Sequence, residues 1–354
     1  MITVNVEASR KYDVEIGDGI VSRLGGLIRD LCPNATKVLV VSETTVAALY
    51  LDVVKEQLEN AGLKVSTYVF EAGEKSKNIN EIAGMWNAMA EAGFTRTDVV
   101  VGLGGGVTTD MAGFAASAFL RGIDVIQVPT SLLAMVDAAV GGKTGIDIPK
   151  GKNQVGAFWQ PKLVLEDISF LKTLPDDVFT EGMGEVTKYA FIMDKELFDL
   201  LVKQNGNIRD DASVLENVIG RCVADKAEVI KADENDNGRR QILNFGHTAG
   251  HVIERDSGFT KPHGICVAKG MGIIIDASVR SGDLDPDEAE KMKDLLKLCS
   301  LPVSDEITPE QIVEGAMNDK KKRGDTLSVI LVDKIGEAVI RKMTAEEFLK
   351  FLSV

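Results

Sequence analysis

All three histidines of this 354-residue chain lie in one short segment, NFGHTAGHVIERDSGFTKPHG, as His247, His251 and His263. Histidine is the commonest metal ligand and titrates near neutral pH, so the cluster indicates a metal site or an acid–base site. His247 and His251 are four positions apart and share one face of a helix. His263 follows a proline and can return as a ligand from a loop or a helix start.

Catalytic zinc sites often combine two histidines with a carboxylate. The segment does not contain the HExxH pattern because Thr248 follows His247, which disfavours a metalloprotease. Spacing alone selects neither the carboxylate nor the two histidines that bind metal.

A glycine run, Gly102 and Gly104 to Gly106, lies where a predicted strand meets a predicted helix. Glycine lets the backbone approach a phosphate, and the helix start offers unpaired N–H groups. We therefore expect a pyrophosphate here, with a plain tight turn as the alternative, because the spacing is not GxGxxG. Glu43, just after an earlier strand, is a candidate acceptor for adenosine ribose hydroxyls.

Two basic sites flanked by glycine follow in a stretch of small residues: Lys143 in GGKT, and Lys152 with Asn153 in GKNQ. A lysine beside glycines suits a phosphate or carboxylate held by the ammonium and nearby backbone N–H groups. Solvated loop lysines are the alternative. Their place after the predicted strands, where parallel sheets bind ligands, favours a functional role.

The elements that must position these residues change character along the chain. Short apolar runs at 37–42, 64–70, 97–106 and 123–131 alternate with helical periodicity, which predicts βαβ units and a mostly parallel sheet. After about residue 175 the pattern is helical, apart from strands near LSVILVDKIGEAVI. We predict a Rossmann-like α/β domain over 1–175 and a mainly helical domain over 176–354.

Composition narrows the class of protein. A net charge of −14 argues against a nucleic-acid surface. No apolar run is long enough to span a membrane, the first residues do not show the charged-then-apolar pattern expected of a signal peptide, and the four cysteines form no CxxC pair. We expect a cytoplasmic protein with reduced thiols.

Seven motifs together resemble the 3-dehydroquinate synthase family of sugar-phosphate cyclases. They are GGGVTTDMAGFAASAFLRG, VPTSLLAMVDAAVGGKTGID, GKNQVGAFWQP, EGMGEVTKYA, DKAEVIKADE, RRQILNFGHTAGHVIE and NDKKK. The resemblance implies bound NAD, a divalent metal (usually Zn²⁺, with Co²⁺ as an alternative) and a homodimer. It also implies the anionic substrate 3-deoxy-D-arabino-heptulosonate 7-phosphate, which is converted by transient oxidation, phosphate elimination, re-reduction, ring opening and aldol closure.

Carried over residue by residue, the resemblance implies Glu185, His247 and His263 as metal ligands. It implies these NAD contacts: Glu74, Lys77, Gly105, Gly106, Val107, Thr108, Thr109, Asp110, Thr130, Ser131, Lys143, Lys152, Leu171, Lys172 and Thr173. It implies these catalytic or substrate contacts: Arg121 (from the neighbouring subunit), Asp137, Lys143, Lys152, Asn153, Lys188, Lys226, Arg240, Asn244, His251 and Lys320.

The chain departs from the family pattern at two places. Thr109 replaces the usual glycine before Asp110 and is expected to crowd the pyrophosphate. HGICV replaces HGEAV, so Ile265 removes an acid that would orient the metal site, and Cys266 places a thiol nearby.

Three other functions fit part of this pattern. A cyclase of the 2-deoxy-scyllo-inosose synthase kind has a substrate without a carboxylate, and the retention of Arg240, Lys226 and the DKK segment disfavours it. An iron-type polyol dehydrogenase is disfavoured by the GGKT and GKNQ sites. A metal-binding module without catalysis leaves the lysines unexplained.

Overall fold

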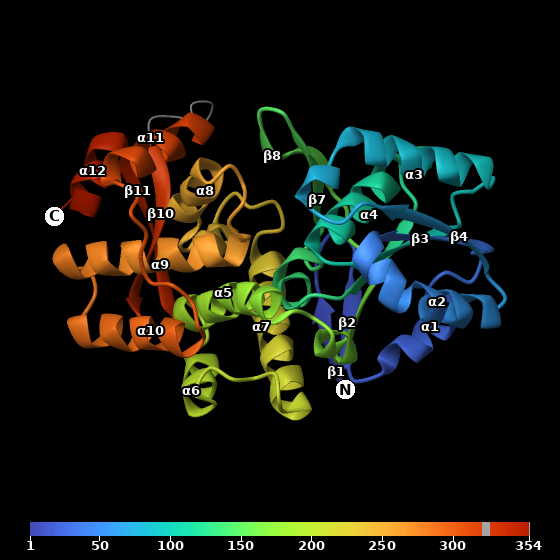
Figure 1. Cartoon of the computed structure of the whole chain (residues 1–354), viewed down its shortest axis with the longest axis horizontal. Coiled ribbons are helices and arrows are strands. Elements are labelled where there is room, and N and C mark those ends of the chain that lie inside the picture. Colours follow the sequence, from blue (N-terminus) through green and yellow to red (C-terminus); the bar gives the residue numbers. More distant parts are fainter. Residues whose placement is uncertain (321–325, 354) are drawn as a thin grey trace. The chain divides into compact units, whose positions relative to one another are not determined.

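The computed structural model describes residues 1–320 and 326–353, without the side chains of 318–320. The chain divides into two compact units (Figure 1). The first contains Met1–Leu174 and Lys226–Asn235, and the second contains Pro175–Asp225 and Asp236–Val354. Helix α7 (Ala212–Ala232) therefore contributes residues to both units. The division predicted from the sequence, at residue 175, does not place residues 226–235 in the first unit.

The first unit is built on a seven-stranded sheet in the order β1-β2-β9-β6-β5-β3-β4. All neighbouring strands are parallel except the edge pair β1 and β2. The strands are β1 (Ile2–Val6), β2 (Tyr12–Gly17), β3 (Lys37–Glu43), β4 (Lys64–Phe70), β5 (Val99–Gly104), β6 (Asp124–Pro129) and β9 (Leu163–Asp167). The four strands expected from the sequence are present, and β1, β2 and β9 extend them.

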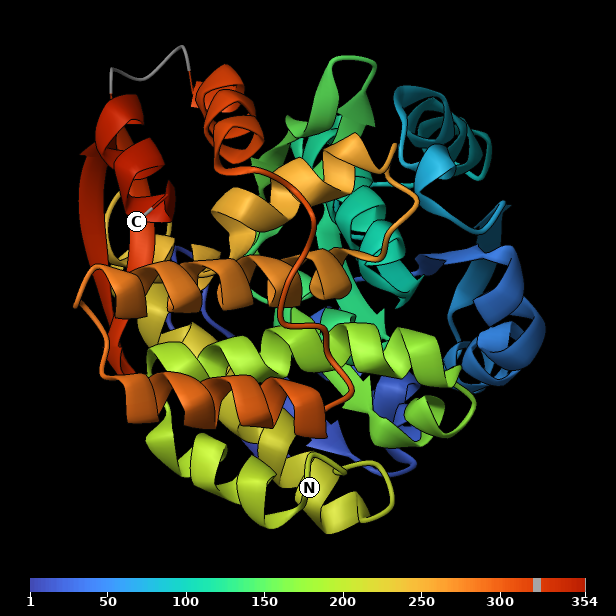
Figure 2. The same cartoon turned by 60° about the vertical axis from the view of Figure 1, so that its left-hand side comes forward.

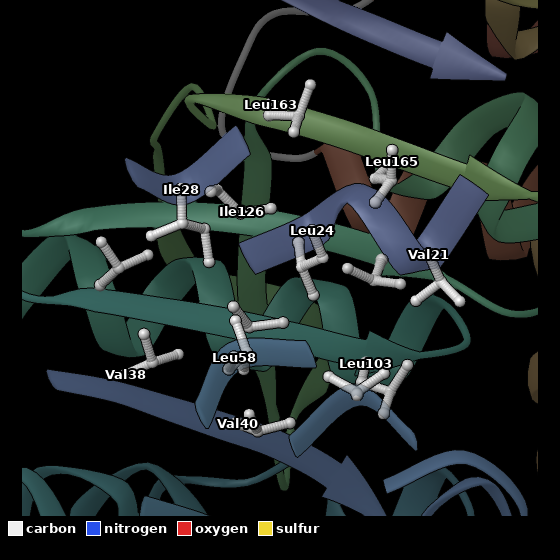
Figure 3. Packing of buried hydrophobic residues seen from close by; sticks show 14 of the residues in the cluster. Val21, Leu24, Ile28, Val38, Val40, Leu58, Leu103, Ile126, Leu163 and Leu165 are labelled. Carbon is white, nitrogen blue, oxygen red and sulfur yellow. The ribbon is translucent and has the colours of Figure 1, made fainter. Parts of the chain in front are cut away.

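Helices cover both faces of this sheet, which explains why its strands are nearly continuous apolar runs. The helices are α1 (Leu24–Leu31), α2 (Thr44–Asn60), α3 (Ile79–Glu91) and α4 (Gly106–Ala118). Val38 and Val40 of β3 pack with α1 and α2, including Leu58 (Figure 3). Leu39 and Val41 of the same strand pack against α3 and α4 on the other face. Alternate residues of one strand thus belong to two separate cores.

Shorter elements complete the first unit. They are η1 (Ile20–Arg23), η2 (Glu74–Ser76), η3 (Phe119–Arg121), the π-helical turn η4 (Ala134–Ala138), η5 (Ile168–Lys172), and the antiparallel hairpin of β7 (Lys143–Ile148) and β8 (Gly151–Phe158). The hairpin carries both GGKT and GKNQ, where no strand was predicted. Its Asn153 has a left-handed backbone with φ of 53°.

The second unit is mostly helical, with one hairpin near its end. Its helices are α5 (Asp176–Ile192), α6 (Lys195–Lys203), η6 (Arg239–Asn244), α8 (His247–Asp256), α9 (His263–Arg280), α10 (Pro286–Leu298), α11 (Pro309–Lys320) and α12 (Ala345–Ser353). The hairpin is formed by β10 (Thr326–Lys334) and β11 (Glu337–Thr344). Helices α5, α9 and α10 lie side by side (Figure 2). The predicted fold class, a Rossmann-like parallel-sheet part followed by a mostly helical part, is confirmed.

No helix among residues 1–320 and 326–353 has both the length and the apolar character needed to cross a membrane.

Candidate functional site

Three helices of the second unit bring Glu185, His247 and His263 together. Glu185 lies in the middle of α5, whereas His247 and His263 are the first residues of α8 and α9. Glu185 Oε1 lies 3.6 Å from His247 Nε2 and 3.5 Å from His263 Nε2. Ligands around a tetrahedral zinc ion, each about 2.0–2.1 Å from the metal, are about 3.3 Å apart. Glu185 Oε1 is therefore at about the spacing from each histidine nitrogen that two ligands of one small divalent cation have.

His251 lies close to the same three residues. The ligand atoms of His247, His251 and His263 are all within 4.8 Å of one another. The rings of His247 and His251 are 5.2 Å apart, as their shared helix face predicts. His251 is exposed, whereas the side chain of Glu185 is fully buried. His251 therefore lies on the solvent-exposed side of the cluster.

Glycines beside the three candidate ligands allow their helices to approach closely. A Cβ at Gly184 would overlap the backbone of Gly264, where α5 meets α9. A Cβ at Gly246, whose φ is 77°, would overlap Met271 and Val267 of α9. Each candidate ligand is thus next to a glycine at a helix contact. The sequences GMGE, FGH and PHG contain this signal, so the glycines could have marked all three ligands.

Two further carboxylates hold His263, and sequence reasoning missed both. Glu254 Oε2 lies 3.3 Å from His263 Nδ1, and Glu181 Oε1 accepts a hydrogen bond of 2.9 Å from the His263 backbone N–H. Ile265 provides no carboxylate beside His263, and Glu254 of α8 lies there instead. Glu254 is three positions after His251, on the same helix face, and this spacing could have identified it.

The charge states of the two ligand histidines differ. Burial lowers the pKa of His247 to about 3, so its ring is neutral at neutral pH. Burial also disfavours the charged form of His263, but hydrogen bonds with Glu185 and Glu254 outweigh it and raise the pKa to about 10. A bound cation would replace that proton at Nε2. The Cys266 thiol is buried and its pKa is raised to about 11, chiefly by burial, so it is protonated at neutral pH.

Other predicted substrate contacts lie in the second unit. The Lys188 ammonium contacts Glu185 Oε2 and is 1% exposed. Arg240, also 1% exposed, and Asn244 both belong to η6, which packs against α5. The side chain of Lys320 lies outside the described residues. The substrate roles of all these residues stay predictions.

In the first unit, the glycine run ends β5 and begins α4, as predicted. Gly105 precedes the helix without a side-chain cap, and Thr130 N–H donates to the Gly104 carbonyl. Thr108 Oγ1 is buried and has no hydrogen-bond partner among the described residues. A Cβ at Gly104 would overlap this hydroxyl. A helix start with an unsatisfied hydroxyl beside glycines fits a phosphate group.

Three other residues predicted at this turn pack in or beside α4. Thr109 is 1% exposed, and its hydroxyl donates a hydrogen bond to the Gly106 carbonyl. The Thr109 side chain is therefore packed in the protein interior. Ser131 Oγ would lie 3.4 Å from a Cβ at Gly105. Val107 packs partly buried against the core on the α3 and α4 side.

A second polar cluster in the first unit joins η2, α4 and the β7–β8 hairpin. Lys77 Nζ lies 2.7 Å from Asp110 Oδ2 and donates to Asn153 Oδ1 at 2.6 Å. Lys152 Nζ lies 3.3 Å from Glu74 Oε1. Burial opposes the charge of Lys77, but Asp110 and Glu74 outweigh it and raise its pKa. Five residues predicted from distant motifs therefore lie together, with Lys77 charged at the centre.

The remaining predicted residues of the first unit are more dispersed. Lys226 of α7 contacts Asp137 of η4, with Nζ 2.8 Å from Oδ1. Lys143 and Arg121 are exposed, and Arg121 has a positive φ of 68°.

The predicted adenosine-side contacts show local roles of their own. Glu43 caps α2, its carboxylate accepting from Thr45 and Val46 N–H. Leu171 is buried, Lys172 Nζ lies 3.2 Å from Asp18, and the Thr173 hydroxyl contacts that of Tyr50. NAD contacts by Glu43 and by these three residues stay predictions.

Comparison with known proteins supports the resemblance seen in the motifs. Residues 67–181 match the family model for the 3-dehydroquinate synthase N-terminal region, and residues 182–322 match the C-terminal region. The chain is 41% identical to 3-dehydroquinate synthase from Clostridium acetobutylicum over the whole length of both proteins.

Two solved structures share the fold over nearly the whole chain. One is 2-epi-5-epi-valiolone synthase from Streptomyces hygroscopicus subsp. jinggangensis 5008 with NAD⁺ and Zn²⁺ bound. It is 27% identical, with a TM-score of 0.88 and coverage of 99% of this chain and 98% of that chain. The other is 2-deoxy-scyllo-inosose synthase with carbaglucose-6-phosphate, NAD⁺ and Co²⁺, 23% identical, with a TM-score of 0.87 and coverage of 99% of each chain. From its motifs, its fold and its full-length similarity, the chain belongs to the 3-dehydroquinate synthase family of enzymes.

Proposed function

We propose that this enzyme converts 3-deoxy-D-arabino-heptulosonate 7-phosphate into 3-dehydroquinate and inorganic phosphate, as a carbon–oxygen lyase of the shikimate pathway. The observation that carries the proposal is the 41% identity, over the full length, to an enzyme of that name. The Glu185, His247 and His263 cluster and the charged residues of both units support it.

Two cofactors belong to this proposal. NAD would bind at the glycine turn that begins α4, and Zn²⁺, or Co²⁺ in its place, would bind Glu185, His247 and His263. A similar enzyme, 27% identical, holds NAD⁺ and Zn²⁺. When bound, NAD accepts and returns the hydride, and the metal polarises the hydroxyl that is oxidised.

The cationic residues explain how an acidic chain receives an anionic substrate. With a net charge of −14, the protein must concentrate positive charge where a phosphate and a carboxylate bind. Lys188 and Arg240 are each 1% exposed, and a desolvated cation attracts an anion more strongly than a solvated one. Arg240 suits a carboxylate because a guanidinium can donate two parallel hydrogen bonds to it.

The polar residues of the first unit have complementary tasks. Lys77 keeps its charge because Asp110 and Glu74 flank it, and it orients the Asn153 amide through the bond to Oδ1. Asp137 holds the Lys226 ammonium in one position. His251, exposed beside the metal ligands, is the side chain of this cluster that would transfer a proton to or from the substrate.

The remaining parts of the proposal concern organisation. NAD binding is assigned to residues 1–175, and metal and substrate binding to residues 176–354. A homodimer in the cytoplasm completes the proposal, with Arg121 reaching the substrate phosphate of the neighbouring subunit. Size-exclusion chromatography coupled to light scattering measures the assembly.

The decisive experiment incubates the protein, NAD⁺ and Zn²⁺ with the heptulosonate phosphate and follows phosphate release and the mass of the product. A seven-carbon sugar phosphate that lacks the carboxylate serves as the matched substrate. Phosphate release from the first substrate alone supports the proposal. Release from the second alone would assign the chain to another cyclase reaction, and accumulation of NADH without phosphate release would indicate a dehydrogenase.

A further inference from the structure

Glu254 is a buried acid next to the candidate metal ligands, and the proposed function gives it no role. It lies in α8, is 5% exposed, and places Oε2 3.3 Å from Nδ1 of His263. The other nitrogen of the same ring, Nε2, lies 3.5 Å from Glu185 Oε1. The imidazole of His263 is therefore bracketed by a carboxylate at each nitrogen.

We infer that Glu254 is a positioning residue that sets the tautomer and the orientation of His263 for metal binding. An Nδ1–H that donates to Glu254 leaves the lone pair of Nε2 directed toward Glu185 and the cation. The carboxylate also makes the ring a more basic ligand. This inference rests on the metal centre of the proposed function.

The two ligand histidines are oriented by groups of different charge. His247 Nδ1 lies 3.1 Å from the Phe245 carbonyl oxygen, a neutral acceptor from its own chain segment. The acceptor beside His263 Nδ1 is Glu254, which reaches it from another helix. His263 is thus the ligand whose geometry depends on a distant side chain.

A purely structural role for Glu254 at the start of α9 is not needed. Glu181 of α5 already accepts the hydrogen bond from the His263 backbone N–H. Pro262 precedes that helix and has no side-chain cap. Glu181 therefore secures the helix start, and Glu254 acts on the ring.

Metal binding to the full-length protein tests the inference without any substrate. Zn²⁺ affinity is measured by competition with a chromophoric chelator, and the visible absorption of the Co²⁺ form reports ligand geometry. Glu254→Ala is expected to weaken metal binding by about 10–100-fold. Glu254→Gln keeps the shape and an acceptor oxygen, so it is expected to weaken binding less; the Co²⁺ bands shift in both variants.

Asp256→Asn is the matched control, because Asp256 is an exposed carboxylate in the same helix that pairs with Arg255. It is expected to keep the wild-type affinity and spectrum. If Glu254→Ala does not fold, the isosteric Glu254→Gln carries the test.

Wild-type affinity and an unchanged Co²⁺ spectrum in a folded Glu254 variant would overturn the inference alone. A wild-type protein that binds neither metal would overturn it together with the proposed metal centre. Failure of the heptulosonate phosphate to react, with metal binding intact and sensitive to Glu254, would count against the proposed reaction only.

Discussion

Lys226 and Asp137 are 89 positions apart, yet Lys226 Nζ lies 2.8 Å from Asp137 Oδ1 and donates at 2.5 Å to the Asp137 carbonyl oxygen. Lys226 is only 5% exposed, so a carboxylate this close helps to compensate the charge of its ammonium. The pair connects α7 to the turn η4 and joins two residues that were predicted from separate motifs.

We expect Asp137→Asn to lower the free energy of unfolding by about 1–3 kcal/mol, because the nearly buried ammonium loses a charged hydrogen-bond acceptor. Lys226→Met should cost less, since it removes the charge that needs compensation. Urea denaturation of both single variants and the double variant gives the coupling energy. Additive effects would mean that the two side chains do not interact appreciably in solution.

Glu166 offers a test of pH dependence in the first unit. It is fully buried in β9, and neither carboxylate oxygen has a hydrogen-bond partner among the described residues. Burial raises its pKa well above the usual 4.5. Above pH 4.5 the unfolded chain has released a proton that the folded protein retains, so stability falls with rising pH until the folded pKa is reached.

Glu166→Gln removes this proton linkage. The stability of the variant relative to the wild type should therefore increase by up to about 1.4 kcal/mol per pH unit above pH 4.5. Urea denaturation at several pH values measures the difference. A difference that stays constant with pH would show that Glu166 is ionised in the folded protein.

Gly264 tests the close contact of α5 and α9. A Cβ there would overlap the carbonyl oxygen of Glu181, so Gly264→Ala should destabilise the protein by about 1–3 kcal/mol. It should also weaken Zn²⁺ binding because it displaces His263. Gly26→Ala in α1 is the control, since nothing lies within 4 Å of its Cβ; it should be neutral or stabilising by up to about 1 kcal/mol.

Thr108 tests the glycine turn as the NAD site. Its buried hydroxyl has no partner among the described residues, so Thr108→Val should leave the thermal stability nearly unchanged. If the hydroxyl binds a phosphate oxygen, NAD affinity measured by calorimetry should fall by about 10-fold. An unchanged affinity would place the pyrophosphate elsewhere.

Metal removal tests the Glu185, His247 and His263 cluster. A chelator should abolish turnover, and added Zn²⁺ or Co²⁺ should restore it, because the donor atoms are already arranged for a cation. His247→Ala should lose activity, and added metal should not restore it. Appreciable turnover by this variant in the presence of chelator would refute the ligand role of His247.

The fold was largely predictable because hydrophobic periodicity reports burial locally. The β3 run KVLVVSE is apolar throughout since both its faces are covered, and the parallel sheet followed from such runs alternating with helices. The hairpin that carries Lys143 and Asn153 was missed. Its strands β7 and β8 are rich in glycine and charged residues and partly exposed, so they lack the apolar signal of a core strand.

The candidate metal centre, too, has a part that the sequence predicted and a part that it did not. The spacing of His247 and His251 on one helix face, and the place of His263 before a helix, were readable because four residues make about one helical turn. The choice of Glu185 came from the resemblance. Glu254 and Glu181 were not identified at all, although each contacts His263.

Local patterning thus determined the apolar core strands and the helices, where the glycine turn lies and that the histidines form one cluster. Only the packing of α5, α8 and α9 decided which acids meet those histidines. The physical reason is that a side-chain contact between distant helices depends on their crossing and on the glycines that let them approach. Periodicity within one helix contains neither quantity.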